Sequence, residues 1–566
     1  MKSGIFLLFM FLAGSLPFLA QDNPPKSHCL SAKPEPPLPT SGRAPRLMTG
    51  IGKASLTITT KSPRVQRYFN QGLALLHCFW GNEARRSFQE AIRLDPNCAM
   101  AYWGIYQVMS NPFTGGANPE EKKEALDKAV ALSSGGSPHE QAYIKAIETR
   151  EALGGKKGRL AYHQAMESLI ADYPNDLQAK LFLAQFLFVY DFSYTFNLTG
   201  EPSKNRQRSL ELIKEVLATD PNNAAAHHYW IHVVEGTNHP ESALNSARIL
   251  SHLAPASGHM VHMPGHIYFR LGNYELARHA FLASLKVEKD YFIQNRINPE
   301  LLWNYSHNLS FLAMNCAEDG RYREGLKWSR LGIPDTDPGI FNLRYAFWDK
   351  AVREFEDPGF IAANAEESPF IKNFYRGLIA FCKGMASIDA GDSAEATRQA
   401  ESLDQTLMAM NATTLSEEEA YDLEFLPKIL AVALPELQGS IKGLQGDLTG
   451  AVTLLHAALN QEQAIGYEEP PPYPRPVFES LGQIYLRAKE WERAREAFQQ
   501  VLKMRPNSGH AFFGIAQSYD LAGQKAEAVV AYKIFLKSWR KADPDLPQVK
   551  TAVARLKQYR AEISLH

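Results

Sequence analysis

A spacing of small, aromatic and proline residues recurs near both ends of the chain and restricts its fold more than any other feature. In each copy a glycine is followed by an alanine, a phenylalanine and a proline at offsets of 12, 16 and 24 residues. The clearest copies are Gly72, Ala84, Phe88 and Pro96, and Gly482, Ala494, Phe498 and Pro506. Small residues let two helices approach closely, and the proline ends the second helix. The spacing therefore predicts repeated pairs of packed helices.

Weaker copies of this pattern lie between the two regions. They are marked by prolines and by Gly-x-Tyr turns, at Pro174, Pro221, Pro255, Gly272 to Tyr274 and Gly320 to Tyr322. The helix formers Ala, Leu, Glu, Lys, Arg and Gln dominate the periodic segments. The spacing resembles that of the 34-residue tetratricopeptide repeat (TPR). We expect an all-α, TPR-type α-solenoid of roughly ten or more helix pairs after an N-terminal signal peptide.

The first residues are typical of a secretory signal. Lys2 precedes an apolar run from Ile5 to Leu19, which Ala20 follows. The run is shorter than the ~20 residues that a membrane-spanning helix needs. No later apolar stretch is long enough to span a bilayer. We therefore expect an exported protein, periplasmic or secreted, without a membrane span.

Changes in composition divide the chain into six expected segments. These are a signal peptide (1–20), a Pro/Ser-rich leader (21–61), an N-terminal TPR array (62–335), degenerate helical repeats (336–467), a Pro-rich segment (468–476) and C-terminal repeats that match the pattern well (477–566). The Pro-rich segment is expected to be stiff, and to act as a hinge, a wall or a simple spacer.

Charge and cysteine usage exclude several classes of function. The net charge is −1, and no basic aromatic stripe or phosphate-binding glycine loop is present, so we expect neither a nucleic-acid partner nor a nucleotide cofactor. The five cysteines have no metal-type spacing. Buried free thiols are favoured over a disulfide between Cys78 and Cys98.

Histidine is concentrated in one part of the chain. Ten of the 17 histidines lie within residues 227–307. Two motifs carry most of them, His227 to Glu235 and Gly258 to Tyr268, and His307 follows in a third helix. Histidines three or four residues apart share one face of a helix. The helix at 258–271 also contains Pro264, which is expected to kink it.

The repeat register places these side chains in the groove of the solenoid. Positions 2, 5, 9 and 12 of the first helix of a TPR face the concave surface. Counting from Ala224, Gly258 and Ser306, seven ligand-type residues take these positions: His228, His232, Glu235, His259, His262, His266 and His307. The remaining histidines, His227, His239, His252 and His279, are expected to be ordinary hydrogen-bonded or surface groups.

Helix geometry limits which of these residues share an ion. His259 and His266 are seven residues apart, which is about 10.5 Å along a helix axis. Neighbouring helices lie 8–10 Å apart, close enough for imidazoles from two helices to converge. The expected arrangement is a four-imidazole set of His228, His232, His262 and His266, with a second level formed by His259 and His307. One ion with outer polar neighbours and two ions side by side both remain open.

An imidazole-rich site favours a transition metal. Zinc, copper and iron accept such ligands, whereas calcium and magnesium prefer oxygen. Six histidines on helices are analogous to dinuclear copper sites. The alternatives are a histidine-lined groove for anions or a pH-sensitive partner, and no special role.

Several stretches resemble a group of bacterial, often exported, TPR proteins with a histidine-rich central region. They are Phe69 to Leu73, Leu94 to Gly104, the two histidine motifs, His307-Asn308, Glu469 to Pro471 and Glu479 to Gly482. The resemblance covers nearly everything after the leader, and it implies the fold rather than a specific activity. It also implies histidines near Gly81 and Ser310, which this chain lacks.

Three functions remain open on the sequence. The first is a binding protein that holds a protein or small-molecule ligand in its concave groove, with a metal site at the centre. The second is a metal-dependent oxidative or hydrolytic enzyme with Glu235 as the candidate acid or base. The third is metal storage or delivery. A closed four-ligand shell would favour a structural metal, and an open three-ligand shell would favour catalysis.

Overall fold

A computed structural model describes residues 44–111, 118–190, 203–299, 302–331, 337–358, 368–415, 423–467 and 470–563. The expected signal peptide and most of the leader lie outside these residues. Within the described ranges there are 25 α-helices and no strands. This confirms the all-α solenoid.

The helices of the first half form seven consecutive pairs, each made of a first and a second helix. They are α1 (Pro63–His77) and α2 (Gly81–Leu94), α3 (Ala99–Ser110) and α4 (Pro119–Leu132), α5 (Pro138–Leu153) and α6 (Gly155–Asp172), α7 (Leu177–Val189) and α8 (Lys204–Thr219), α9 (Ala224–Val234) and α10 (Leu244–Leu253), α11 (Gly258–Arg270) and α12 (Tyr274–Asn295), and α13 (Trp303–Glu318) and α14 (Tyr322–Ser329). Short 3₁₀ turns lie at Ser133–Gly135 and Pro240–Ala243.

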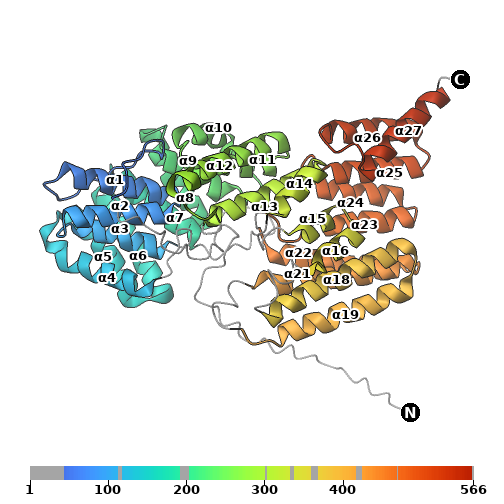
Figure 1. The fold of residues 1–566 in the computed structure, drawn as a ribbon, viewed down its shortest axis with the longest axis horizontal. Coiled ribbons are helices and arrows are strands. Elements are labelled where there is room, and N and C mark those ends of the chain that lie inside the picture. The colour runs from blue at the N-terminus through green and yellow to red at the C-terminus, as the bar shows by residue number, and fades with distance from the viewer. Residues whose placement is uncertain are drawn as a thin grey trace, which may run out of the picture.

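Among the described residues, five further pairs and a final helix follow. They are α15 (Pro338–Arg344) and α16 (Trp348–Phe355), α18 (Pro369–Ala390) and α19 (Ser393–Asn411), α21 (Phe425–Leu444) and α22 (Leu448–Ile465), α23 (Val477–Arg487) and α24 (Trp491–Met504), α25 (Gly509–Leu521) and α26 (Lys525–Ser538), and α27 (Pro547–Ile563). The twelve pairs stack side by side along the molecule (Figure 1).

The recurring glycines and phenylalanines form one packing unit. A Cβ atom added to Gly72 or Gly104 would lie 2.5 Å from the ring of Phe88, so glycine is needed for the first helices of two repeats to pack on this ring. Gly482 and Gly514 pack in the same way on Phe498. The spacing in the sequence therefore reflects a repeated contact between helix glycines and a phenylalanine ring.

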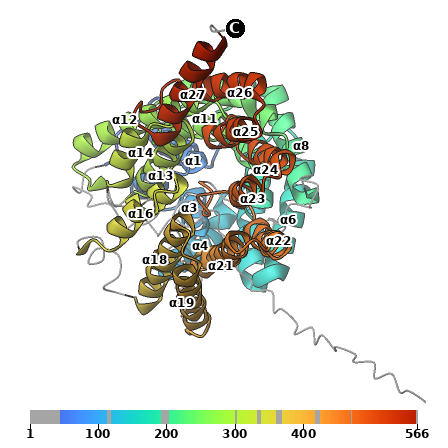
Figure 2. The same ribbon diagram turned by 90° about the vertical axis from the view of Figure 1, so that its right-hand side faces the viewer.

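The superhelix brings the C-terminal repeats back onto the middle of the chain. The Tyr274 hydroxyl donates to the Pro506 carbonyl at 2.8 Å, and the Trp539 indole donates to the Glu318 carbonyl at 2.8 Å. Figure 2, seen end-on, shows α25 to α27 beside α11 to α14 around a common axis. The Glu318 carboxylate, 0% exposed, accepts from Arg344 and Arg505 at 2.8 Å each. A buried ion network therefore joins α13 to α15 and to the end of α24.

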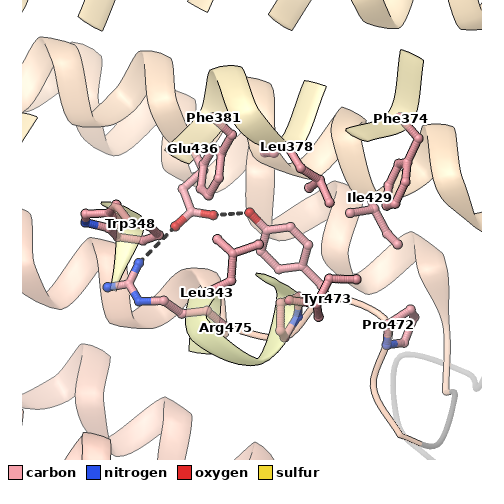
Figure 3. A pocket seen from close by; sticks show the side chains of 13 residues that line it. Leu343, Trp348, Phe374, Leu378, Phe381, Ile429, Glu436, Pro472, Tyr473 and Arg475 are labelled. Atoms are coloured by element: carbon pink, nitrogen blue, oxygen red, sulfur yellow. Dashed lines mark hydrogen bonds and ion pairs between the residues drawn. The ribbon is translucent and has the colours of Figure 1, made fainter. Parts of the chain in front are cut away.

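The described part of the Pro-rich segment packs against the second half of the array. Tyr473 and Arg475 both bind the buried carboxylate of Glu436 on α21, as Figure 3 shows. With Pro472 they cover a small apolar cavity lined by side chains of α18, among them Phe374. In this position residues 472–475 form a wall of the cavity.

Other expectations concern loops, thiols and the helix at 258–271. Residues 44–61 are irregular and pack on the first repeats through Ile51, Leu56 and Ile58. The four described cysteines are free and buried, as expected. Helix α11 runs without a break through Pro264. No helix among those described is long and apolar enough to cross a membrane.

Candidate metal centre

Three successive first helices carry the six groove histidines. They are α9, with His228 and His232, α11, with His259, His262 and His266, and α13, with His307. All six side chains are buried, with relative exposures between 0 and 6%. A buried cluster of this kind needs partners for every ring nitrogen.

The histidines form two groups of three rather than the expected set of four. One triad is His228, His232 and His259, and the other is His262, His266 and His307. Within each triad the three ligand-type nitrogens lie within 4.8 Å of one another. Each triad therefore combines positions 5 and 9 of one repeat with position 2 of the next.

The two triads are related by the repeat itself. His262 and His266 lie 34 residues after His228 and His232, which is one repeat length. In both triads a histidine at position 2 of one first helix lies level with positions 5 and 9 of the first helix before it, so successive first helices are staggered. The expected four-imidazole set assumed equal levels, and the stagger separates its two pairs. His259 and His266 fall in different triads, in agreement with their separation along α11.

The Nδ1 atoms of the first triad are all held by oxygen acceptors. His228 Nδ1 donates to the His77 carbonyl at 2.7 Å, and His232 Nδ1 donates to Glu235 at 3.0 Å. His259 Nδ1 donates to Asn304 Oδ1 at 2.9 Å. A neutral imidazole that donates through Nδ1 carries its lone pair on Nε2. All three Nε2 atoms of this triad are thereby set up as ligands.

In the second triad, two histidines also donate through Nδ1 to oxygen acceptors. His262 Nδ1 donates to Asn308 Oδ1 at 2.7 Å, and His266 Nδ1 donates to Glu235 at 2.8 Å. The amide of Asn308 is oriented by its own NH₂ group, which donates to the Phe281 carbonyl at 2.9 Å. In the first triad the NH₂ group of Asn304 is likewise fixed by Glu288, at 2.6 Å. Both amide oxygens must therefore face the imidazoles.

The Nε2 atoms of each triad are brought unusually close together. His228 Nε2 lies 3.0 Å from the Nε2 atoms of both His232 and His259, and His262 Nε2 lies 2.7 Å from that of His266. With the protons on Nδ1, lone pairs face one another across these gaps. Burial lowers the pKa of His228, His259 and His262 well below the ordinary value, which disfavours an added proton. A cation at the centre of each triad would remove this repulsion.

Glu235 lies between the triads and joins them. One of its oxygens accepts from His232 and the other accepts from His266, one residue of each triad. Burial alone would raise the pKa of this carboxyl, but the two histidines hold it below its usual range. Glu235 was expected as a ligand and as an acid or base. The structure places it behind the Nδ1 atoms, where it orients imidazoles, and not among the converging nitrogens.

Aromatic rings enclose both triads. The ring of Phe79 lies 4.6, 5.4 and 5.4 Å from the rings of His228, His232 and His259. Phe311 lies 4.3 to 5.1 Å from the three rings of the second triad. Apolar walls of this kind exclude water and strengthen the electrostatic interactions inside. Phe79 is held at a φ of 55°, a strained value for a residue with a Cβ atom.

A small cavity adjoins the first triad. It has a volume of about 30 Å³, enough for a water molecule, and its lining includes His259, Phe79, Trp303 and Glu288. One oxygen of Glu288 accepts from Asn304, and the other has no hydrogen-bond partner within the described structure. Burial raises the pKa of Glu288 to about 8. The cavity provides space for a small molecule beside His259.

The other histidines of the region behave as expected. His227 bonds to Ser246 and to the Pro221 carbonyl, and His239, His252 and His279 are exposed.

Sequence reasoning missed the residues that support the ligands. Nothing in the repeat register places His77, Phe79 or Asn304 in the groove beside the histidines. His77 also precedes its partner His228 by 151 residues. Asn308 directly follows His307, and this adjacency was the one available clue.

Comparison with known proteins identifies the scaffold. Models of the tetratricopeptide repeat match residues 480–547 and 260–291. The chain carries tetratricopeptide repeats. The second match covers most of α11 and α12, so His262 and His266 stand on a TPR helix. A search of curated proteins finds no match.

Solved structures match this chain at low sequence identity and low TM-score. Yeast Tom70 is 11% identical over 88% of this chain and 96% of that chain, with a TM-score of 0.30. The human IFIT1 dimer with m7Gppp-AAAA is 13% identical over 85% and 91%, with a TM-score of 0.32. The APC/C hetero-tetramer Cut9-Hcn1 is 15% identical over 88% and 76%, with a TM-score of 0.30.

Proposed function

We propose that this TPR protein binds two transition-metal ions, one at each histidine triad, and that the pair forms a catalytic centre. The observation that carries the proposal is the convergence of the Nε2 atoms, which approach to 2.7–3.0 Å while their Nδ1 atoms donate to fixed acceptors. Carboxylate or carbonyl support behind each ligating imidazole is characteristic of histidine metal sites.

Copper fits the ligands best. All six converging groups are imidazoles. The carboxylate of Glu235 accepts from His232 and His266 and is therefore occupied behind them. Imidazole suits copper, zinc, nickel and iron, and nitrogen sites generally bind copper(II) most tightly. Di-iron centres in helical proteins instead rely on several glutamates. Paired copper ions would supply electron-transfer chemistry with dioxygen.

Three ligands per ion favour catalysis over a structural metal. Structural sites are usually closed by four protein ligands, whereas catalytic sites keep an open position. The cavity beside His259 provides room for a small molecule at the first triad. Because Glu235 already accepts from two histidines, we do not assign it the acid–base role. A binding protein with a passive metal and a metal-storage protein remain the alternatives.

The rest of the molecule suits partner binding. TPR arrays present an extended concave surface, and we propose that this groove holds a protein or a small ligand near the metals. Export to the periplasm or medium remains a proposal based on the first 20 residues. An oxidising location would favour a copper centre that operates with dioxygen.

Dioxygen uptake tests the catalytic proposal. The protein is loaded with two equivalents of copper and supplied with a mild reductant, and uptake is followed with an oxygen electrode. We expect sustained uptake, lost with zinc in place of copper and reduced at least about tenfold in His259→Asn, which retains the second triad.

Tightly held copper without uptake would contradict catalysis and favour a binding protein. Copper that exchanges rapidly with a competing chelator, again without uptake, would favour storage or delivery. Equal uptake by His259→Asn at the same copper concentration would show that the activity does not come from the paired site.

A further inference from the structure

A single tryptophan, Trp303, contacts both histidine triads. Its ring centroid lies 5.2 Å from that of His259 in the first triad and 5.7 Å from that of His307 in the second. The side chain begins α13 and is 9% exposed. An indole gives up one electron far more readily than the phenyl rings of Phe79 and Phe311, which also enclose the triads. Trp303 is therefore placed to exchange electrons with an ion at either triad.

Two further oxidisable rings lie beside Trp303 and reach the surface. Trp80 and Tyr291 line the same small cavity as Trp303, and this cavity has room for about one water molecule. Their two rings pack edge to face with centroids 4.7 Å apart, and both side chains are half-buried. A space of about the size of one water molecule thus lies between Trp303 and a pair of rings that solvent can reach.

Tyr291 also has an acceptor for its proton. Its hydroxyl donates to Glu83 Oε1 at 2.7 Å. A phenol that loses an electron becomes strongly acidic, so a base within hydrogen-bond reach makes its oxidation easier. Glu83 is held in place on its other side by Arg86, which donates to it at 2.6 Å. The pair of Tyr291 and Glu83 can therefore lose an electron while the proton stays nearby.

The burial of the triads makes such a route necessary. The six ligand histidines are at most 6% exposed, so a reductant in solution does not reach an ion held between them. Electron transfer through protein slows steeply with distance, and several short steps between oxidisable side chains are faster than one long step. Tyr229 also contacts the first triad, but it is 0% exposed and its hydroxyl bonds to His77. The rings of Trp303 and Tyr291 provide the shorter way to the surface.

We propose that Tyr291 and Trp303 form an electron relay from a one-electron reductant in solution to the triads, an inference that rests on the copper centre proposed above. In each transfer, copper(II) gains one electron from Trp303, Trp303 regains one from Tyr291, and the phenolic proton of Tyr291 moves to Glu83. The reductant then returns one electron to the tyrosyl radical, and the proton returns from Glu83. The net change is one electron from reductant to copper, with no net proton transfer.

Anaerobic reduction of the copper-loaded full chain tests the relay. Hexaammineruthenium(II), which donates one electron without binding, is added in excess, and loss of the copper(II) signal is followed by freeze-quench EPR. We expect Tyr291→Phe and Trp303→Phe each to slow reduction at least about tenfold, while metal analysis finds the copper content unchanged. The control Trp328→Phe removes a half-buried tryptophan on α14, whose indole donates to Glu324, and should leave the rate unaltered.

The proton step gives a second readout, which a merely structural role of Tyr291 would not change. Reduction of the unaltered chain should be slower in D₂O than in H₂O, and Tyr291→Phe should lose this difference because no phenolic proton moves. Unchanged rates in Tyr291→Phe, or the same isotope effect, would overturn the relay and leave the copper centre standing. A chain that takes up no copper would overturn both. If Trp303→Phe loses copper, Tyr291→Phe decides, because its hydroxyl bonds to Glu83 on α2.

Discussion

Replacing Glu235 by alanine is expected to weaken metal binding at both triads, on the order of 10- to 100-fold at each. The carboxylate holds the Nδ1 atoms of His232 and His266, and these two residues belong to different triads. Without it both rings lose the acceptor that fixes their tautomer and orientation. Competition titration with a chromophoric chelator measures the two affinities.

Matched variants separate this effect from general damage to the fold. Asn304→Leu removes the acceptor for His259 alone, and Asn308→Leu removes the acceptor for His262 alone. Each should weaken one site and leave the other within about twofold, because the remaining Nδ1 partners are intact. If Glu235→Ala weakens one site and spares the other, the bridging role is wrong.

Glu318→Gln is expected to destabilise the protein by about 3–5 kcal/mol. The Glu318 carboxylate, completely buried, binds Arg344 and Arg505, which are themselves 1% and 5% exposed. Glutamine removes the negative charge and leaves two buried cations with less compensation. Because these residues join the middle of the chain to its C-terminal repeats, contacts between α13 and α25 should loosen first.

Urea unfolding followed by circular dichroism measures the change in the free energy of unfolding. Hydrogen exchange reports whether protection is lost at the junction before it is lost elsewhere. Glu492→Gln is the control, because this side chain is 89% exposed and its ion pair with Arg495 spans 4.0 Å. A loss below about 1 kcal/mol for Glu318→Gln would mean that the network does not hold the superhelix together.

The fold and the groove-facing histidines could be predicted because both follow from periodicity. The Gly72–Phe88 contact repeats along the chain, and a fixed register turns sequence position into a face of a helix. The grouping of the histidines could not be predicted, since the stagger between neighbouring helices depends on how their side chains pack. For this reason His259 groups with His228 and His232 of the preceding first helix.

The contacts that support the ligand histidines could not be predicted for a different reason. His77 and Phe79 reach the first triad from a repeat about 150 residues earlier, through the winding of the superhelix. Glu235 is a possible ligand at a groove position. It supports the imidazoles instead, because the Nδ1 atoms of His232 and His266 face it and their Nε2 atoms do not. No sequence spacing specifies the direction of an imidazole.

Elemental analysis of the protein purified without chelator or affinity metal tests the central claim most directly. We expect two transition-metal ions per chain, and copper when both copper and zinc are supplied. We expect one ion per chain in His307→Asn, because that change disrupts the second triad and leaves the first. A chain that contains no metal and takes up none on titration with copper or zinc would contradict it.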